Sequence, residues 1–598
     1  MERLRELGKL IVERASWLAP MVVAAICTWM TARALYEQSF AIFGRDQGIF
    51  QYVAWALRNG ERAYVDVRDI NGPLPHLWHM VMQALGGEDE HTFRTIDTWM
   101  LVLAYGLGIA TMPRWIDLEV KPRGLVFWAL AGIGVLGAQY VRYDWWHTAQ
   151  RESLYAVLIF ASVALQSIAH KTKSRRRALG CFAAGAALTT LTWFGKPPCV
   201  VFAALQACVF ILDRRSFHIP FRHAMAACAA GAAIVCAAML AFVASYGDVV
   251  QGIMVLSDVP KLHHTIWNES IGRIYTLYGN RPRLDWALAT ILGYFVAYRF
   301  LKLKRRSLLA LVLPIGGALL FFGQGKAFPY HMHMLTLGTA IVQLVILAAL
   351  VRNAPARDPL FGWVVILAAF LLGYKSHNDA RLSQAMKSDW STIGATAEMR
   401  TAPEYFDRFP WDDFGALDLR NAAAFVASKT KPTDRVQMYA LDPYFLFLAK
   451  RKSATPIIYN FELNVDAALQ GGTGTKPSPE IKKWLLAHRD AAEFDVLDRV
   501  KANPPAAFVL VDKSPFTHAP NAEKDFAEHC PTLSDFLHER YVEADRFGVV
   551  GVWLRKDLEA PAKSEDADPK PTEPPPADPP DTDPSPSDAS PTDAPATD

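Results

Sequence analysis

Two charged clusters follow the first hydrophobic segment of this 598-residue chain, and they contain the side chains best suited to chemistry. Arg45 and Asp46 stand together, and Arg68 and Asp69 follow 23 positions later, just before Ile70-Asn71-Gly72-Pro73. Ionised groups at the edge of a membrane are costly and are usually either paired or functional. A carboxylate there can accept a proton, and an arginine can hold a phosphate. The alternative for Asp46 is an ion pair with Arg45 or another basic residue, and Asp69 could orient an acceptor or bind a divalent metal, or could equally cap a turn.

Further candidates stand at the ends of later hydrophobic segments. Glu152 opens one of them, and a carboxylate there could simply complement the helix dipole. Lys196 lies in the helix-breaking turn Gly195-Lys196-Pro197-Pro198, where it could bind phosphate or extend to lipid headgroups. Lys326, Tyr330 and His331 form another group that could contact a phosphate or belong to a surface turn.

Three other features are weaker candidates for chemistry. Asp144 and His147 lie in an aromatic loop that is also typical of a membrane-interface belt. His263 and His264 are adjacent and would point apart on a helix, which disfavours a metal pair. The seven cysteines contain no Cys-x-x-Cys pair, so the sequence predicts neither a zinc site nor a disulfide framework.

The elements that must position these residues are mostly membrane helices. Hydrophobic residues make up 52% of the chain, and apolar runs recur that are long enough to cross the roughly 30 Å hydrocarbon layer. This composition excludes an ordinary soluble enzyme. Eleven spans are predicted, with 1–375 as the membrane domain: 16–36, 93–112, 124–141, 153–169, 179–195, 198–212, 224–245, 285–301, 308–323, 333–351 and 359–374.

The basic residues orient these spans. If the N-terminus is inside the cell, the inside loops are short and basic, and two of them contain Lys171–Arg177 and Lys302–Arg306. Basic loops are retained on the cytoplasmic side. The first outer loop is then 37–92, and every candidate named above faces outward. We expect an integral protein of a bacterial-type inner membrane, with a retained first span and the C-terminal part outside.

Two stretches of the first outer loop have the apolar spacing of helices lying in the membrane interface. They are 47–59 and 74–86, and they would hold Asp46 and Asp69 near the headgroups.

The C-terminal third has a different pattern. Residues 376–556 read as an extracytoplasmic α/β domain, with helices at 417–428 and 443–450 and strands at 436–440, 507–511 and 549–554. The domain contains no glycine-rich phosphate loop and no nucleophile elbow. Residues 557–598 form a predicted disordered tail, because residues 559–598 contain 12 prolines, 11 acids and no aromatic residue.

These motifs, in their order, resemble the first outer loop and later turns of the GT-C glycosyltransferases. The resemblance is to the branch of protein O-mannosyltransferases and lipid A aminoarabinose transferases. It rests on Arg45-Asp46, on Tyr64-Val65-Asp66-Val67-Arg68-Asp69, and on three later motifs: Gln150–Ser153, Thr192–Pro197 and Lys326–His331. One departure is that relatives often have Lys-Pro-Pro after the second acid, where this chain has Ile70-Asn71-Gly72-Pro73.

The resemblance implies a polytopic GT-C-like fold and transfer of a sugar from a polyprenyl-phosphate donor to an envelope acceptor on the outer face. It implies that Asp46 is the general base, and we place Asp69 and Glu152 beside it. The candidates for donor phosphate binding are Arg45, Arg68, Lys196, Lys326, Tyr330 and His331.

Donor, acceptor and lipid bilayer are therefore the expected partners, with no nucleic acid. The sugar, the acceptor (lipid, glycan or protein) and any divalent metal stay open. Two alternatives also stay open: a lipid-linked sugar transporter or flippase, and a non-catalytic relative that acts as an envelope binding protein. Charges gathered on one face disfavour a transporter, which needs ionisable groups at mid-membrane.

Overall fold

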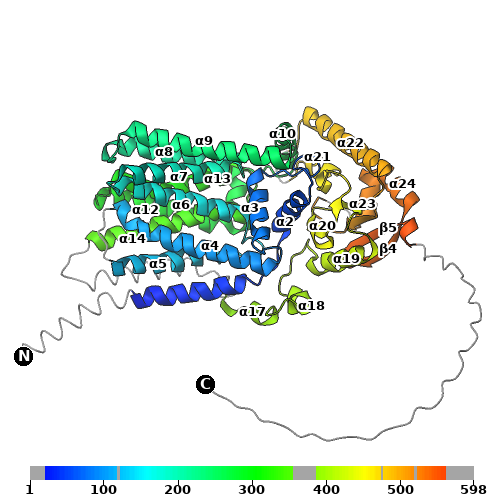
Figure 1. Ribbon diagram of the computed structural model, residues 1–598, viewed down its shortest axis with the longest axis horizontal. Coiled ribbons are helices and arrows are strands. Elements are labelled where there is room, and N and C mark those ends of the chain that lie inside the picture. Colours follow the sequence, from blue (N-terminus) through cyan, green and yellow to red (C-terminus); the bar gives the residue numbers. More distant parts are fainter. Residues whose placement is uncertain (1–20, 117–121, 354–385, 473–475, 517–520, 560–598) are drawn as a thin grey trace, which may run out of the picture.

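The computed structural model describes residues 21–116, 122–353, 386–472, 476–516 and 521–559. A bundle of long helices forms one half of the molecule and a sheet with flanking helices forms the other, with α2 and α3 between them (Figure 1). The predicted eleventh span, 359–374, and the tail beyond Glu559 lie outside the described residues. The last four described residues, Lys556–Glu559, form the short helix α25.

Helices occupy the other ten predicted spans. Residues 21–38 are helical, and the remaining nine helices are α4 (Glu90–Thr111), α5 (Pro122–Tyr140), α6 (Arg151–Lys171), α7 (Arg175–Trp193), α8 (Val200–Asp213), α9 (Phe221–Tyr246), α12 (Asn280–Phe300), α13 (Val312–Gly323) and α14 (His333–Asn353). Within the described ranges, six helical segments are long and apolar enough to cross a membrane by length and composition, and α5 is a shorter apolar helix. The fold is therefore that of a polytopic helical membrane protein with a C-terminal sheet.

Helices α2 (Arg45–Arg58) and α3 (Pro73–Ala84) form at the two stretches expected to lie in the membrane interface. Their surroundings differ from that expectation, because the polar side of α2 is buried as well as its apolar side. Gln47 and Gln51 are fully buried, and their amides donate to the carbonyls of Thr148 at 2.7 Å and Gly87 at 2.8 Å. Helix α2 is thus enclosed by protein on both its polar and its apolar side, and it does not lie on the membrane surface.

The C-terminal sheet has five strands in the order β2-β1-β3-β5-β4. The strands are β1 (Arg435–Tyr439), β2 (Lys452–Ser453), β3 (Ala507–Val511), β4 (Tyr541–Phe547) and β5 (Val550–Arg555). Strand β1 pairs in parallel with β2 and β3, and β5 runs antiparallel to both β3 and β4. All five residues of β3 are buried, as expected for a central strand covered on both faces.

Helices surround this sheet and connect it to the bundle. They are α17 (Trp390–Ile393), α18 (Pro403–Phe406), α19 (Ala416–Lys429), α20 (Tyr444–Ala449), α21 (Asp466–Leu469), α22 (Pro479–Ala502), α23 (Ala522–His529) and α24 (Pro531–Arg540). The predicted helices at 417–428 and 443–450 correspond to α19 and α20, and the three predicted strands to β1, β3 and β5. We call residues 386–559 the sheet domain.

The sheet domain packs directly on α2. Gly48 makes this possible, because a Cβ there would lie 2.6 Å from the Cβ of Tyr444 on α20. The Tyr52 hydroxyl accepts a hydrogen bond from the Ser453 backbone at 2.9 Å. The extended segment before α3 also joins the domain, since the Arg68 amide donates to the Pro456 carbonyl at 2.9 Å. Both acidic clusters of the sequence therefore lie between the bundle and the sheet domain.

Two further helices, α10 (Val249–Ile266) and α11 (Ile271–Thr276), connect α9 to α12 on this side of the bundle. Helix α10 contacts α21 of the sheet domain, where the His263 ring meets Phe461. It also brings His263 close to Arg151 at the start of α6 and to Lys326 before α14.

Candidate active site

A buried carboxylate with three basic side chains around it forms the centre of the candidate site. Glu152, in the first turn of α6, is fully buried. Its Oε1 lies 2.9 Å from Lys196 Nζ, 3.1 Å from Arg151 Nε and 3.7 Å from His331 Nε2. The helix start, the turn between α7 and α8, and the segment before α14 supply these groups. Glu152 thus gathers the cations Arg151 and Lys196, together with His331, from three parts of the chain at one point.

Asp46 lies beside this centre, in the first turn of α2. It accepts a hydrogen bond from the Tyr330 hydroxyl and lies close to Arg151 and Glu152. Burial is the main reason that the pKa of Asp46 is raised above its usual range, and the Glu152 carboxylate adds to the effect. A carboxyl group with a raised pKa is suited to accept a proton. The residue as a whole is only partly buried.

Lys326 adds another cation next to the centre. Its Nζ lies 2.9 Å from His263 Nδ1 on α10. Burial, together with the charges of Lys196 and Arg151, lowers the pKa of Lys326 to about 7. Arg151, Lys196 and Lys326 therefore give three positive charges against the two carboxylates Asp46 and Glu152 when all five are ionised. An anion entering here would relieve the repulsion between the cations.

Asp69 lies in a separate hydrogen-bond network. Its carboxylate is 2.6 Å from His76 Nε2, and it accepts hydrogen bonds from Asn71 Nδ2 at 2.7 Å and from the Tyr459 hydroxyl. Burial by itself would raise the pKa of Asp69, but these hydrogen bonds and the nearby His76 outweigh it and lower the pKa. Asp69 is thus held ionised by both α3 and the sheet domain, and Asp46 is close enough to act electrostatically on Tyr459.

The turn after Asp69 lies against the segment that carries Lys196. The Leu74 amide donates to the Phe194 carbonyl at 3.1 Å, and a Cβ on Gly72 would lie 2.2 Å from that same oxygen. Only a glycine allows this approach. The fold therefore places Lys196-Pro197-Pro198 beside the turn that follows Asp69, although Lys196 lies 127 positions after Asp69 in the sequence.

The two arginines of the acidic clusters point elsewhere. Arg45 Nε donates to Asp442 Oδ1 at 2.8 Å, and its other nitrogens contact Asp413. Arg68 Nη2 lies 2.9 Å from Glu462 Oε2, an acid that is fully buried. Both arginines are therefore bound by carboxylates of the sheet domain and lie outside the cation cluster. Arg45 thus forms its ion pairs with Asp442 and Asp413 and not with the adjacent Asp46.

Three groups that the structure places at the site were not predicted from the sequence. Arg151 belongs to the Gln150–Ser153 motif, and its position next to Glu152 could have identified it as a site residue. His263 was considered only as a metal ligand, whereas it contacts Lys326. Tyr459 lies 390 positions after Asp69, and no local pattern connects the two.

The aromatic loop forms a second wall of the site. His147 Nδ1 lies 2.6 Å from Asp144 Oδ1, and the His147 ring stacks on Tyr330 with centroids 5.9 Å apart. The loop continues to Trp146, which stacks on Trp411 of the sheet domain at 4.3 Å. Among the described residues, no group of three His, Cys, Asp or Glu side chains is arranged to hold a metal ion.

No family model matches this sequence, and no curated protein matches it. Solved structures do match the fold. A crystal structure of ArnT from Cupriavidus metallidurans bound to undecaprenyl phosphate is 14% identical with a TM-score of 0.50, covering 92% of this chain and 99% of that chain. The Archaeoglobus fulgidus oligosaccharyltransferase tethered with an acceptor peptide is 10% identical with a TM-score of 0.47, covering 92% and 75%. The apo form of the same oligosaccharyltransferase is 12% identical with a TM-score of 0.43, covering 84% and 70%.

The likeness to ArnT extends over nearly the full length of both chains. It shows that this chain has the fold of the GT-C glycosyltransferases, a helical membrane bundle followed by a sheet-containing domain.

Proposed function

On the premise of this GT-C fold, we propose that the protein is a membrane glycosyltransferase that transfers a sugar from a polyprenyl-phosphate donor to an envelope acceptor. The observation that carries the proposal is the cation surplus of Arg151, Lys196 and Lys326 beside the carboxylate of Asp46. A base and an anion-binding cluster in contact are the two parts that displacement of a lipid phosphate from a sugar requires.

Asp46 is the proposed general base. Its carboxylate takes the proton from the acceptor group, the acceptor atom forms a bond to the sugar C1, and the bond between C1 and the phosphate oxygen breaks. The electron pair of that bond leaves with the polyprenyl phosphate. The raised pKa of Asp46 improves its match to this task.

The cations are the proposed binding site of the leaving phosphate. The ammonium groups of Lys196 and Lys326 would bind the phosphate as compact point charges, and the planar Arg151 guanidinium would donate two parallel hydrogen bonds to it. Lys196 takes the place of the lysine that follows the second acid in the relatives this chain resembles, because Gly72 lets the two turns meet. Glu152 and His331, buried beneath, position these cations. Tyr330 donates to Asp46 and so orients the base.

Asp69 is proposed as a positioning residue for the acceptor. Its network with His76, Asn71 and Tyr459 fixes it while leaving it ionised. Arg45 and Arg68, in contrast, are proposed to dock the sheet domain.

The positive-inside pattern supports placing the site and the sheet domain on the outer face of the inner membrane, where lipid-linked sugars and envelope acceptors meet. Reporter fusions after residues 90 and 380 test this, and both are expected to report the outer compartment. A cytoplasmic signal from either contradicts the topology.

The function itself is tested with purified protein reconstituted with a polyprenyl-phosphate sugar and envelope extract. We expect release of polyprenyl phosphate and a glycosylated product by mass spectrometry. Asp46→Asn should lower the rate at least about 10²-fold, because general base catalysis contributes about 10²–10⁴. Asp66→Asn, which removes an exposed carboxylate paired with Arg62, is the matched control and should keep the rate.

Three outcomes would overturn the proposal. Substantial turnover by Asp46→Asn contradicts the base assignment. Donor moved across the bilayer with its sugar still attached identifies a flippase. Binding of envelope material with no release of polyprenyl phosphate identifies a non-catalytic relative.

A further inference from the structure

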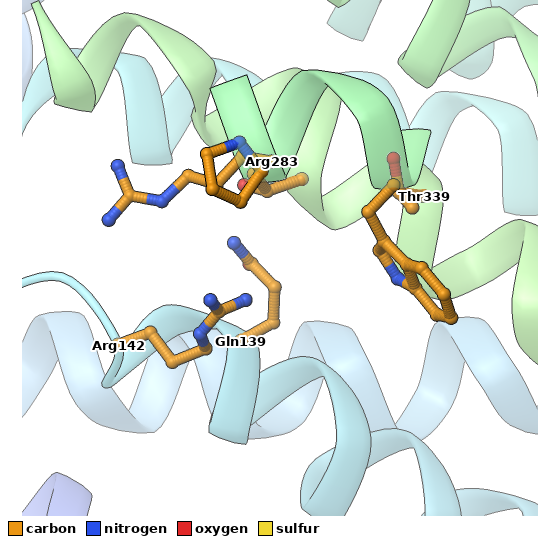
Figure 2. Close-up of a pocket in the computed structure, with 7 residues that line it drawn as sticks. Gln139, Arg142, Arg283 and Thr339 are labelled. Atoms are coloured by element: carbon orange, nitrogen blue, oxygen red, sulfur yellow. The ribbon is translucent and has the colours of Figure 1, made fainter. Parts of the chain in front are cut away.

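A second basic pocket lies at the ends of three bundle helices and shares none of its lining residues with the cluster around Asp46. It is lined by residues just after and within α5, at the start of α12 and in the first turns of α14: Gln139, Arg142, Pro282, Arg283, Trp286, Thr336 and Thr339. Arg142 and Gln139 reach toward it from one wall and Arg283 from the opposite wall, with Thr339 at the other end (Figure 2). The lining contains two arginines and no carboxylate, which is suited to an anion.

Arg283 is the most informative lining residue. Its Nη1 is buried and makes no hydrogen bond to the described residues. Its guanidinium lies 5.7 Å over the ring of Tyr143, whose hydroxyl is 2.9 Å from the Thr336 hydroxyl. The hydrogen bond holds the Tyr143 ring in place beneath the Arg283 guanidinium. A buried donor without a partner is costly, and an incoming acceptor would relieve that cost.

The position of the pocket indicates where the anion comes from. Arg142 lies two residues beyond the end of α5, and Pro282 and Arg283 lie in the first turn of α12. The next turns of α12 expose apolar side chains to the surroundings, with Leu288 and Leu292 each more than half exposed. Cations at the end of a helix, followed by exposed leucines, correspond to the headgroup level followed by the hydrocarbon layer.

The chemistry of the lining selects among anions. The Arg283 guanidinium offers forked donors that match the oxygens of a phosphate, and it binds them with greater strength than neutral donors do. Arg142 adds a second positive charge to the lining. The Gln139 amide can donate to one of the remaining oxygens. The Thr336 and Thr339 hydroxyls donate to the carbonyls of Met332 and Leu335, so they line the pocket as polar atoms only. The Trp286 ring is suited to the boundary between headgroup and tail.

We propose that this pocket binds the phosphate of an anionic membrane lipid, with the lipid tail lying along the exposed face of α12. This site is distinct from the proposed phosphate site at Lys196 and Lys326 and does not rest on the proposed function. The two regions adjoin. Tyr143 contacts both Arg283 and His333, with its ring centroid 4.0 Å from that of His333, and His333 Nε2 lies 2.8 Å from the carbonyl of His147 in the wall of the first site.

The test uses the full-length protein in nanodiscs of phosphatidylcholine with increasing phosphatidylglycerol. Lipids that remain bound are counted by native mass spectrometry, and the thermal midpoint is recorded. We expect saturable retention of phosphatidylglycerol by the wild-type protein. Arg283→Gln should weaken retention about tenfold or more, the size of one charge-assisted hydrogen bond, and the double variant with Arg142→Gln more so.

Arg281→Gln is the matched control, since Arg281 is exposed and lies two positions away on the same helix. It should leave retention unchanged. Arg283→Lys keeps the charge but loses the fork, and it should give intermediate retention even if the glutamine variant fails to fold. Asp46→Asn should retain the lipid as the wild type does, whatever its activity.

Two results would overturn the proposal. Equal loss in Arg281→Gln and Arg283→Gln would mean that general surface charge binds the lipid. An equal rise in the thermal midpoint with inorganic phosphate, at the same concentration as the lipid phosphate, would mean that the pocket binds soluble phosphate.

Discussion

Two charged regions of this molecule differ in how their charges are matched. Where the sheet domain meets α2 and the loops beside it, cations and carboxylates come in pairs: Arg45 with Asp442, Arg68 with Glu462 and Arg420 with Glu90. At the ends of α6 and α14, three cations share two carboxylates.

The difference separates docking from binding. A matched buried pair adds little net stability, yet removing one partner is strongly destabilising. Such pairs therefore fix how two parts of the chain meet. A surplus of buried cations is unfavourable without a ligand, and the lowered pKa of Lys326 expresses that cost. A region of this kind is expected to gain a ligand that completes its charge.

Breaking a matched pair should give the largest effect on stability. Arg45→Met leaves Asp442 and Asp413 without their partner and should cost about 3–5 kcal/mol, measured as a lower unfolding midpoint in detergent. Adding Asp442→Leu should restore most of the loss. Arg62→Met, which removes an exposed pair with Asp66, should cost less than about 1 kcal/mol. Equal losses from both single variants would show that the Arg45 pair has no docking role.

Removing a surplus cation should instead weaken donor binding. Lys196→Met should raise the dissociation constant for the lipid-phosphate donor about 10–100-fold, since a hydrogen bond to a charged group contributes about 1.5–3 kcal/mol. The double variant Arg68→Met with Glu462→Gln removes a matched pair and should leave donor affinity unchanged. Binding to the purified protein measures both. A larger loss in the double variant would reverse the assignment of the two regions.

The surplus region should also be sensitive to pH. Lys326 loses its charge as pH rises through about 7, so kcat/KM should fall about tenfold per unit above that value. On the acid side, activity is lost as Asp46 becomes protonated, at a pH above its usual pKa because burial raises it. Lys326→Arg should move the alkaline limb to higher pH and leave the acid limb in place. An unmoved alkaline limb would exclude Lys326 as its origin.

The smallest expected effect tests whether the sheet domain shapes the site. Tyr459→Phe removes one hydrogen bond to Asp69 and should lower kcat/KM several-fold, in line with about 1 kcal/mol for a single hydrogen bond. Tyr439→Phe removes a similar bond to Asp525 within the sheet domain and serves as the control. If both variants keep full activity, the Asp69 network is not needed for transfer.

Local sequence determined much of the architecture. Apolar run length predicted ten of the helices described here, and the alternation of short apolar runs with turns predicted β1, β3 and β5. The same local patterns predicted helices at α2 and α3. They did not predict that Gln47 and Gln51 would be buried, because amphipathic spacing does not reveal which protein surfaces cover a helix.

Only the tertiary structure decided which charges meet. From sequence alone, Arg45 and Arg68 were as good candidates for phosphate binding as Lys196 and Lys326. Their actual partners, Asp442 and Glu462, lie almost 400 positions away. Pairing of side chains depends on distances set by long-range packing, which no local pattern encodes. The residue types therefore determined that a base and cations were available, and the packing of α6, α14 and the sheet domain determined which of them form one site.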